Sequence, residues 1–403
     1  MNYLLVNHIA ARPGRSPGEL VFPRAWYDDL IAQSNALAQH NIRLIVATPI
    51  EERAATSDAV SITPDLAGFE HLPIPGYKSA RQFLRSRVEL MQVLTHAIAA
   101  ADIIQFDIGG HPLTPAVIGE PIARLRHKPI VWVFGNENPI PALRRANADR
   151  HTTKRLAGHG LNLRMESFLR ESIAHSEVVF THGPNVLDEL ALNCNAVHLI
   201  DRLNLSDQVL MSAEKIQARR AHLLDNSQPL IFQVKAGNSF GAWGEHALRA
   251  IAHVARLHVS ARMHLCVNVD EFKPIQSRVI ELKLAKIVTI DTKESSSADI
   301  DLEPSPLPAE DTDLSRSVAL GRAPIAYRSG ATDSLGTALT RIQRHDERAL
   351  AHAMLEASVD RPALVRRMLD GLAHAKASTI EASHRRRASI IAQTFSNGIS
   401  RVA

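Results

Sequence analysis

The sequence predicts an α/β protein built from two doubly wound domains, and three observations support this. Its 403 residues exceed the usual span of one hydrophobic core, so two domains of about 150 to 200 residues each are expected. Short apolar runs alternate with helix-length amphipathic segments, an order typical of parallel sheets covered by helices. Aromatic residues make up only 4% of the chain. The cores must therefore consist mainly of Ala, Leu, Ile and Val, which suits helices packed on parallel strands.

The first half of the chain carries short apolar runs that are rich in β-branched residues and bounded by polar or turn residues, as buried strands are. These runs span residues 3–6, 42–48, 101–107, 129–134 and 177–182. Between them, residues 25–40 and 80–100 carry apolar side chains at helical spacing. The alternation of strand and helix predicts one doubly wound sheet.

The same alternation restarts in the second half, after a polar-rich bridge. A strand-like run at 197–200 precedes this bridge. The runs after it span residues 229–234, 262–269, 286–290, 298–304 and 323–328, with a helix at 244–258. From Arg341 onward the pattern is helical, and Pro362 fits a first helical turn. We therefore expect an N-terminal domain, a C-terminal domain and a last helix that packs back towards the N-terminal domain. Their predicted bounds are 1–205, 206–380 and 381–403.

The two cysteines, Cys194 and Cys266, have neither the spacing of a zinc site nor that of a disulfide framework. Their pattern favours a reducing, cytoplasmic setting. The N-terminus has a short apolar run with no basic segment before it, which is typical of a first strand and not of a signal peptide. No window reaches the roughly 18 apolar residues that a membrane-spanning helix needs.

Basic residues form local clusters in this chain, whose net charge is +4. Two of the clusters run from Arg81 to Arg87 and from His384 to Arg387. Such clusters predict either solvated helix faces or contact with an anionic ligand or an anionic membrane surface. Nucleic acid is not an expected partner, because the sequence lacks basic segments with interleaved aromatic residues, zinc-finger patterns and RNP motifs.

The order of the segments and several local phrases resemble the family 4 glycosyltransferases, whose architecture of two Rossmann-like domains facing a cleft is called GT-B. The phrase FQVKAGNSFGAWGEHALRAIA resembles the opening of the family's second domain, with Lys235 at a basic position and Trp243 in place of a later lysine. The phrase ADIDLEPSPLPAEDTDLSRSVALGRAPIAYRSGATDSLG is similar to the family's strand, acidic loop, helix and second strand. The paired-glutamate motif is degenerate, because Arg316 stands where the second glutamate is expected.

The resemblance covers most of the chain, and it implies a function. This function is the transfer of a hexose from a nucleotide sugar to a glycan or lipid-linked acceptor in surface polysaccharide biosynthesis. Retention of configuration and catalysis without a metal or cofactor are also implied. Two alternatives remain. One is a non-catalytic GT-B protein that binds a sugar nucleotide or a partner enzyme, which Arg316 and Trp243 favour. The other is a sugar-nucleotide epimerase.

The candidate catalytic and donor-binding residues follow predicted strands, because ligands of open parallel sheets collect at the carboxyl ends of the strands. The ammonium group of Lys235 is expected to stabilise the leaving diphosphate, and acidic side chains are expected to accept hydrogen bonds from sugar or ribose hydroxyls. We predict Lys235, Glu310 and Asp313 as catalytic residues. The predicted donor-binding residues are Gly14, Gly18, Lys235, Asp311, Ser329, Gly330 and Thr332, where the glycines and nearby amides allow the backbone to approach a phosphate.

The candidate acceptor-side residues follow strands of the first domain. They are His111, Asn136 and Glu137. Their imidazole, amide and carboxylate groups are of the types that orient a hydroxyl or take its proton. The sequence contains no P-loop, metal-ligand pattern or Ser/His/Asp arrangement.

Overall fold

The computed structural model describes most of the chain. The described residues are 1–16, 18–51, 58–63, 68–77, 79–107, 113–134, 152–182, 196–200, 203, 205–235, 241–257, 259–303, 311–327, 335–342 and 346–399. Within these ranges, the side chains of residues 80, 152–159, 161–162, 241–243, 311–313 and 396–399 are outside the description. The described part divides into two compact units, which are unit 1 (Met1–Asp201 and Ser383–Ala403) and unit 2 (Arg202–Ala382).

Unit 1 is built on a parallel sheet of seven strands in the order β10-β9-β8-β7-β1-β4-β6. The strands are β1 (Asn2–Val6), β4 (Arg43–Ile50), β6 (Glu70–Pro75), β7 (Ile103–Asp107), β8 (Ile130–Phe134), β9 (Val178–Thr181) and β10 (Val197–Leu199). Alternate residues of β1 enter two different cores: Tyr3 and Leu5 belong to one, Leu4 and Val6 to the other. Both faces of the sheet are therefore buried, which explains why the strand reads as a continuous apolar run.

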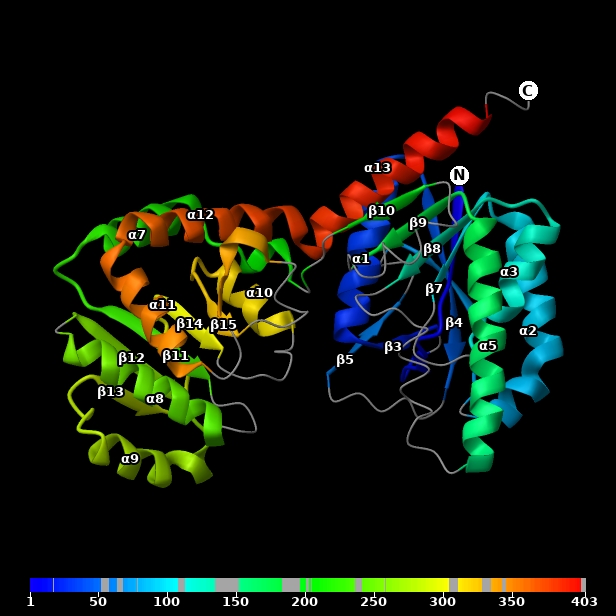
Figure 1. Cartoon of the computed structure of the whole chain (residues 1–403). Coiled ribbons are helices and arrows are strands. Elements are labelled where there is room, and N and C mark those ends of the chain that lie inside the picture. The colour runs from blue at the N-terminus through cyan, green and yellow to red at the C-terminus, as the bar shows by residue number, and fades with distance from the viewer. Residues whose placement is uncertain are drawn as a thin grey trace. The chain divides into compact units, whose positions relative to one another are not determined.

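Helices cover the two faces of this sheet (Figure 1). They are α1 (Arg24–Ala38), α2 (Ala80–Ala100), α3 (Ala116–Leu125), α5 (Thr152–Ala174) and α13 (Ile380–Ile399). The first core contains apolar residues of α1 and α13, and the second contains those of α2, α3 and α5. A small antiparallel sheet adds β2 (Arg12–Pro13), β3 (Leu20–Pro23) and β5 (Ala59–Ile62).

Unit 2 contains a second parallel sheet, with six strands in the order β13-β12-β11-β14-β15-β16. The strands are β11 (Leu230–Lys235), β12 (Ala261–Cys266), β13 (Val288–Asp291), β14 (Ile300–Glu303), β15 (Ile325–Tyr327) and β16 (Thr340–Ile342). The helices are α7 (Ala213–Leu224), α8 (Gly241–Arg256), α9 (Phe272–Glu281), α10 (Asp311–Ala319), α11 (Glu347–Val359) and α12 (Arg361–Ser378). Short 3-10 turns lie at Asp207–Val209, Val269–Glu271 and Gly336–Ala338. Two parallel sheets flanked by helices confirm the predicted doubly wound α/β class.

Two details differ from the sequence prediction. Arg341 and Ile342 belong to strand β16, and the C-terminal helices begin only at Glu347, because a short edge strand is too brief to show a period. His384 and Arg387 were candidates for a solvated or lipid-facing surface, but they are only 2% and 3% exposed. Their polar groups bind Asp29 and Gln105 inside unit 1, so they are structural. No helix among the described residues has the length and apolar character needed to cross a membrane.

Candidate functional site

The carboxyl ends of three neighbouring strands of unit 2 bring polar side chains together. In the parallel register, Lys235 at the end of β11 pairs with Cys266 at the end of β12, which in turn pairs with Asp291 at the end of β13. This edge is where parallel α/β sheets usually bind ligands. The predicted residue Lys235 therefore lies where the strand pattern placed it.

Lys235 is held by a carboxylate that the sequence analysis did not single out. Its Nζ lies 3.1 Å from Oε1 of Glu294, and its side chain is 20% exposed. The pKa of the Cys266 thiol at the end of the neighbouring strand is raised, mainly by burial and secondly by the charge of Glu294. Glu294 follows the predicted strand at 286–290, so its position after a strand was the signal that could have identified it.

A buried hydrogen-bond network anchors the segment that carries Glu294. Oε1 of Gln233 accepts a hydrogen bond from the backbone N–H of Ser295 at 2.7 Å, and Nε2 of Gln233 donates to Asp301 at 3.1 Å. Nη1 of Arg322 donates to both carboxylate oxygens of Asp301 at 3.0 Å. Nη2 of Arg322 donates to the carbonyl of Ser295 at 2.9 Å. The backbone N–H and the carbonyl of Ser295 are thus both bound by side chains of the sheet core.

A pocket of about 430 Å³ adjoins this segment in unit 2. Its lining is rich in basic groups and also includes Glu294; the basic residues are Lys215, Arg219, Arg316 and Arg322. Arg219 and Arg322 form ion pairs with Asp299 and Asp301. The positive charge of the pocket therefore comes from Lys215 and from Arg316, which stands at the position of the expected glutamate. Such a surface suits an anionic group, because its positive charges are already oriented before a ligand arrives.

A tyrosine and a histidine meet at the end of another strand of this sheet. Nδ1 of His246 on α8 lies 3.1 Å from the hydroxyl of Tyr327, the last residue of β15. Burial, followed by the charges of two nearby acids, raises the pKa of Tyr327 to about 12. The hydroxyl therefore stays protonated at neutral pH and can act as a hydrogen-bond donor.

Unit 1 has its own polar pair at the carboxyl edge of its sheet. Nδ1 of His8, two residues after β1, lies 3.0 Å from Oδ1 of Asp107, the last residue of β7. Burial alone would lower the pKa of His8, but the charge and hydrogen bond of Asp107 outweigh it and raise this pKa. A histidine oriented by a carboxylate is the usual arrangement of a general base. Asp107 ends a predicted strand and His8 follows another by two residues, and these positions were the available signal.

The predicted glycine loop of unit 1 is closed by an internal carboxylate. Gly14 donates its N–H to the carbonyl of Glu19 at 2.7 Å, and Gly18 has a φ of +77°. Oε2 of Glu19 accepts the N–H groups of Arg15 and Ser16 at 2.7 and 2.8 Å. The backbone amides that could face a phosphate here thus bind a carboxylate of the same chain.

The remaining predicted residues are only partly described. Asp311 and Asp313 lie in the first turn of α10, and Trp243 lies in the first turn of α8, but the description does not include their side chains. Glu310, Ser329, Gly330, Thr332, His111, Asn136 and Glu137 lie outside the described residues. No cluster of metal-ligating side chains occurs in the part of the chain that the structure describes.

Comparison with known proteins finds similarity only among solved structures. No protein-family model matches the sequence, and no curated protein matches it either. Among solved structures, HepE from Anabaena in complex with UDP has a TM-score of 0.55 and 13% identity, covering 98% of this chain and 100% of that one. A glycosyltransferase from Rickettsia africae has a TM-score of 0.54 and 12% identity, covering 98% and 99%.

A third similar structure is sucrose-phosphate synthase from Thermosynechococcus elongatus, with a TM-score of 0.53 and 14% identity over 98% of this chain and 99% of that one. At such low identity the likeness concerns the fold, and it extends over nearly the whole chain. Together with the two helix-flanked parallel sheets, it shows that the chain has the two-domain, Rossmann-like GT-B fold.

Proposed function

We propose that this protein is a glycosyltransferase that uses a nucleotide sugar as donor. The observation that carries the proposal is the Lys235–Glu294 pair at the ligand-binding edge of a GT-B fold, beside a basic pocket. Among the proteins with this fold, HepE has been solved with UDP and with UDP-glucose. A nucleoside diphosphate is the anionic leaving group that such an edge would stabilise.

We assign the donor phosphates to the carboxyl edge of the unit 2 sheet. The ammonium group of Lys235 would offset the charge that develops on the diphosphate as the sugar departs, without a metal ion. Glu294 keeps this ammonium group in place, and the Gln233–Asp301–Arg322 network keeps the segment of Glu294 in place. The predicted donor and sugar contacts of unit 2 are part of this proposal; they are Glu310, Asp311, Asp313, Ser329, Gly330 and Thr332. For Gly14 and Gly18 a donor contact stays a prediction, and it would require the amides of that loop to release Glu19.

We assign acceptor activation to unit 1. His8 has a carboxylate partner that orients its ring, and it could take the proton from the acceptor hydroxyl as the new glycosidic bond forms. The predicted acceptor-side residues His111, Asn136 and Glu137 would orient the same acceptor. Family resemblance implies retention of configuration, whereas a general base of this kind is what a single displacement with inversion requires. The anomeric configuration of the product, read by proton NMR, distinguishes these two mechanisms.

Titration calorimetry with UDP and other nucleoside diphosphates, followed by a transfer assay with a panel of nucleotide sugars, tests the donor site. Lys235→Ala should weaken nucleotide binding by about 10-fold or more, since a charge-assisted contact is lost. Lys286→Ala removes the same charge from an exposed position and should leave the affinity unchanged. If the wild-type protein binds no nucleoside diphosphate, the proposal fails.

His8→Ala should separate binding from chemistry. We expect nucleotide affinity to stay the same while kcat falls about 10²- to 10⁴-fold, the usual contribution of a general base. In the wild-type protein, kcat/KM should rise with pH through the raised pKa of His8, because only the neutral ring accepts a proton. A variant of the exposed His96 should keep full activity. An unchanged kcat in His8→Ala would remove His8 from the mechanism.

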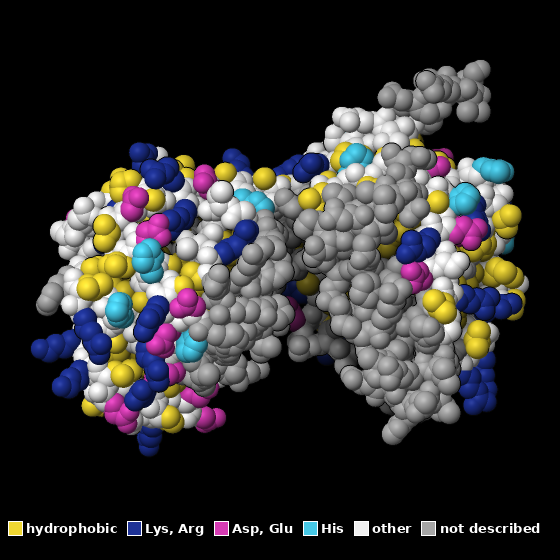
Figure 2. Space-filling view, viewed as in Figure 1, with side chains coloured by type: hydrophobic (Ala, Val, Ile, Leu, Met, Phe, Trp, Pro, Cys, Tyr) yellow, Lys and Arg dark blue, Asp and Glu magenta, His cyan; other side chains and the backbone are white. Residues whose placement is uncertain are grey.

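For the acceptor we propose a glycan or lipid-linked molecule of surface polysaccharide assembly, reached at the inner face of the membrane. The observation that favours a membrane is a stripe on α2. Leu84, Val88 and Met91 follow helical spacing and are 60%, 58% and 44% exposed. Exposed arginines flank the stripe, namely Arg81, Arg85 and Arg87. In Figure 2, dark blue and yellow side chains alternate over the region where Figure 1 draws α2.

An apolar stripe bordered by arginines suits an anionic lipid surface, because apolar side chains enter the acyl boundary while guanidinium groups meet the headgroups. Flotation with anionic vesicles should therefore recover the protein. Leu84→Ser/Val88→Ser should lower the vesicle-bound fraction, with a partition coefficient that falls at least about 10-fold. Leu257→Ser/Ile280→Ser, at exposed apolar sites of unit 2, should bind as the wild type does. Equal binding by all three proteins would rule out this surface.

The second candidate function is a non-catalytic protein that binds a sugar nucleotide or a partner enzyme. It is favoured by Arg316, which lines the basic pocket at the place of an expected glutamate. The same assays separate the candidates. Nucleotide binding with neither hydrolysis nor transfer would favour the non-catalytic protein, and a change in the donor sugar's configuration without transfer would favour an epimerase.

A further inference from the structure

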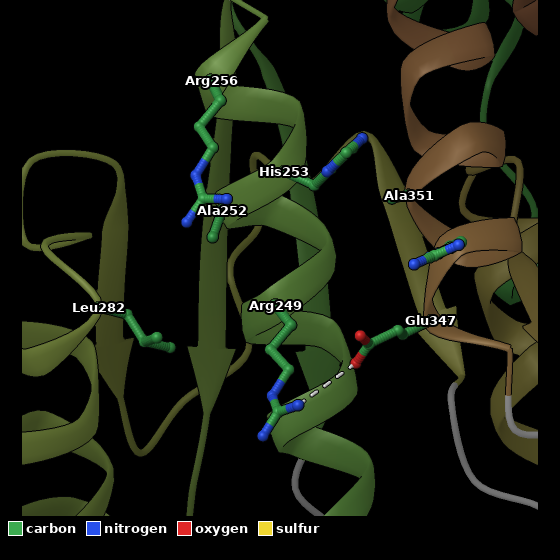
Figure 3. A pocket seen from close by; sticks show the side chains of 8 residues that line it. Arg249, Ala252, His253, Arg256, Leu282, Glu347 and Ala351 are labelled. Atoms are coloured by element: carbon green, nitrogen blue, oxygen red, sulfur yellow. Dashed lines mark ion pairs between the residues drawn. The ribbon is translucent and has the colours of Figure 1, made fainter.

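A second basic pocket lies on unit 2 between helices α8 and α11 (Figure 3). Its volume is about 540 Å³, which is within the range of sites that hold small molecules. Its floor includes Ala252 of α8 and Ala351 of α11. The short side chains of these alanines leave space between the two helices. Larger residues there would fill the pocket, so the local sequence keeps it open.

Positive side chains dominate the rim of this pocket. It is lined by three arginines and a histidine, with one carboxylate among them; these are Arg249, Arg256, Arg348, His253 and Glu347. Figure 3 shows Arg249 and Arg256 extending from α8 into the space beside Leu282. Three guanidinium groups against one carboxylate leave the lining with a net positive charge. Buried Leu248, Ile251 and Val254 of α8 face the core, so the arginines lie on the outer side of the helix.

Arg249 is held in place by neighbouring carboxylates. Its Nε donates to Oε1 of Glu245 at 2.9 Å, and its Nη1 lies 3.8 Å from Glu347. Arg278 in turn donates through Nε to Glu245 at 2.9 Å. Hydrogen bonds from Arg278 are the main reason why the pKa of Glu245 falls to about 2. One guanidinium group of the pocket is therefore oriented before any ligand binds.

The other two arginines have no such partners. Among the described residues, no hydrogen bond or ion pair involves the guanidinium group of Arg256 or Arg348. Arg256 lies in the last turn of α8, where a positive charge complements the helix dipole. Arg348 lies in the first turn of α11, where the dipole disfavours a positive charge. The helix dipole therefore does not stabilise the positive charge of Arg348, whereas a bound anion would stabilise it.

We propose that this pocket binds the phosphate group of a small phosphorylated metabolite. Arg249, Arg256 and Arg348 line one pocket, and guanidinium groups match phosphate oxygens with paired hydrogen bonds. The alanine floor and Leu282 offer an apolar surface to the rest of such a ligand. The pocket shares no lining residue with the Lys235 edge or with the pocket of Arg316. The proposal therefore does not depend on the proposed glycosyltransferase activity.

Calorimetric titration with inorganic pyrophosphate tests this site, with Lys235→Ala as the parent protein so that the donor edge does not contribute. We expect saturable binding, with one site in this pocket; any binding to the pocket of Arg316 would be the same in all variants compared. Adding Arg256→Ala/Arg348→Ala should raise the Kd at least about 10-fold, because two charge-assisted contacts are lost. Adding Arg220→Ala/Arg262→Ala removes the same charge from exposed positions elsewhere in unit 2 and should change the Kd less than about 2-fold.

A second measurement keeps the test independent of heats of ion release. Glucose 1-phosphate should raise the melting temperature of the Lys235→Ala parent, and glucose should not. The increase should vanish in the Arg256→Ala/Arg348→Ala protein, whose far-UV circular dichroism must match that of the parent. No pyrophosphate binding by the parent, or an equal loss of affinity in both double variants, would overturn the proposal. If Lys235→Ala alone abolishes nucleotide binding, that result concerns the donor site and does not affect the proposal of a phosphate site between α8 and α11.

Discussion

At the scale of single residues, buried polar groups of unit 2 determine where functional groups lie. The side chains of Arg322 and Asp301 are only 6% and 9% exposed, and they form an ion pair at 3.0 Å. Each is acceptable in the core only because the other is present. The guanidinium group of Arg322 also binds the carbonyl of Ser295. The residue that stabilises the core therefore also positions the segment that carries Glu294.

Arg322→Leu should therefore be strongly destabilising. We expect the free energy of unfolding to fall by about 3 to 5 kcal/mol, because the carboxylate of Asp301 stays buried without its partner. Adding Asp301→Leu should recover part of the loss, since no buried charge is then left. Urea unfolding followed by circular dichroism measures both variants. A double variant less stable than Arg322→Leu would contradict this account, because the unpaired carboxylate would then not be the main cost.

His71 of β6 is a residue-scale source of pH dependence in unit 1. Its Nε2 is buried without a hydrogen-bond partner in the described structure, and burial lowers its pKa from 6.5 to about 4. Between these two values the unfolded chain binds the extra proton and the folded chain does not. Stability should consequently fall as the pH drops from 6.5 towards 4.

His71→Leu should remove this part of the pH dependence, because the ionisable group is gone from both states. Melting temperatures measured between pH 7 and 4 should decline less steeply in the variant than in the wild type. The melting temperature of His40→Leu, a variant at an exposed position, should decline as steeply as that of the wild type. Parallel curves for the wild type and His71→Leu would mean that His71 does not titrate as described.

At the scale of elements, helices α10 and α12 approach closely at a glycine. A Cβ atom at Gly371 would lie 2.9 Å from Cγ1 of Val318, and Val318 is fully buried. A β-branched side chain in a packed core cannot move away easily. The glycine is therefore required by the contact between two helices, although glycine is unfavourable inside a helix.

Gly371→Ala should destabilise unit 2 by about 1 to 3 kcal/mol, as overpacked cores do. In a Val318→Ala background the sign should reverse. The closest contact is then absent and only the Cβ of Ala338 remains near, at 3.4 Å, so the higher helix propensity of alanine should stabilise by about 0.5 to 1 kcal/mol. Urea unfolding of the four proteins measures the coupling. A stabilising Gly371→Ala in the wild-type background would contradict the close approach.

The strands of the two parallel sheets with long apolar runs and the long amphipathic helices could be predicted from the sequence, whereas β2, β3, β5, β6 and β16 were not predicted. Strands such as β8 are short, apolar on both faces and rich in β-branched residues, so their signal is local. In contrast, β6 contains Pro73 and Pro75 and lies at the sheet edge, and β16 has three residues. Their conformation depends on neighbouring strands and not on their own pattern.

At the scale of the whole molecule, the last residues of the chain belong to unit 1, together with the N-terminal half. Ser383–Ala403 belong to unit 1. Arg387 of α13 donates to Oε1 of Gln105 at 3.0 Å, and the same oxygen accepts from Tyr3 at 2.8 Å and Gln33 at 2.9 Å. The buried side chains of α13 that join this core are Ala388, Ile391 and Phe395.

Removing residues 383–403 should therefore destabilise unit 1 and leave unit 2 folded. Calorimetry should show one transition at lower temperature, and limited proteolysis should cleave unit 1 first. Arg387→Leu is the milder test, and we expect it to cost about 1.5 to 3 kcal/mol through lost hydrogen bonds to a charged group. Arg386→Ala, at an exposed position, should be neutral. Unchanged unfolding of Arg387→Leu would contradict this role.

By itself, the sequence determined the doubly wound α/β class and the place of Lys235 at a strand end, because both follow from patterns within short segments. Only the tertiary structure decided which polar side chains meet. His8 binds Asp107, Glu294 binds Lys235, and two basic pockets form between helices. Neighbouring parallel strands are joined by long crossovers, so residues that share one edge are far apart in the chain. Local spacing carries no signal for such pairs.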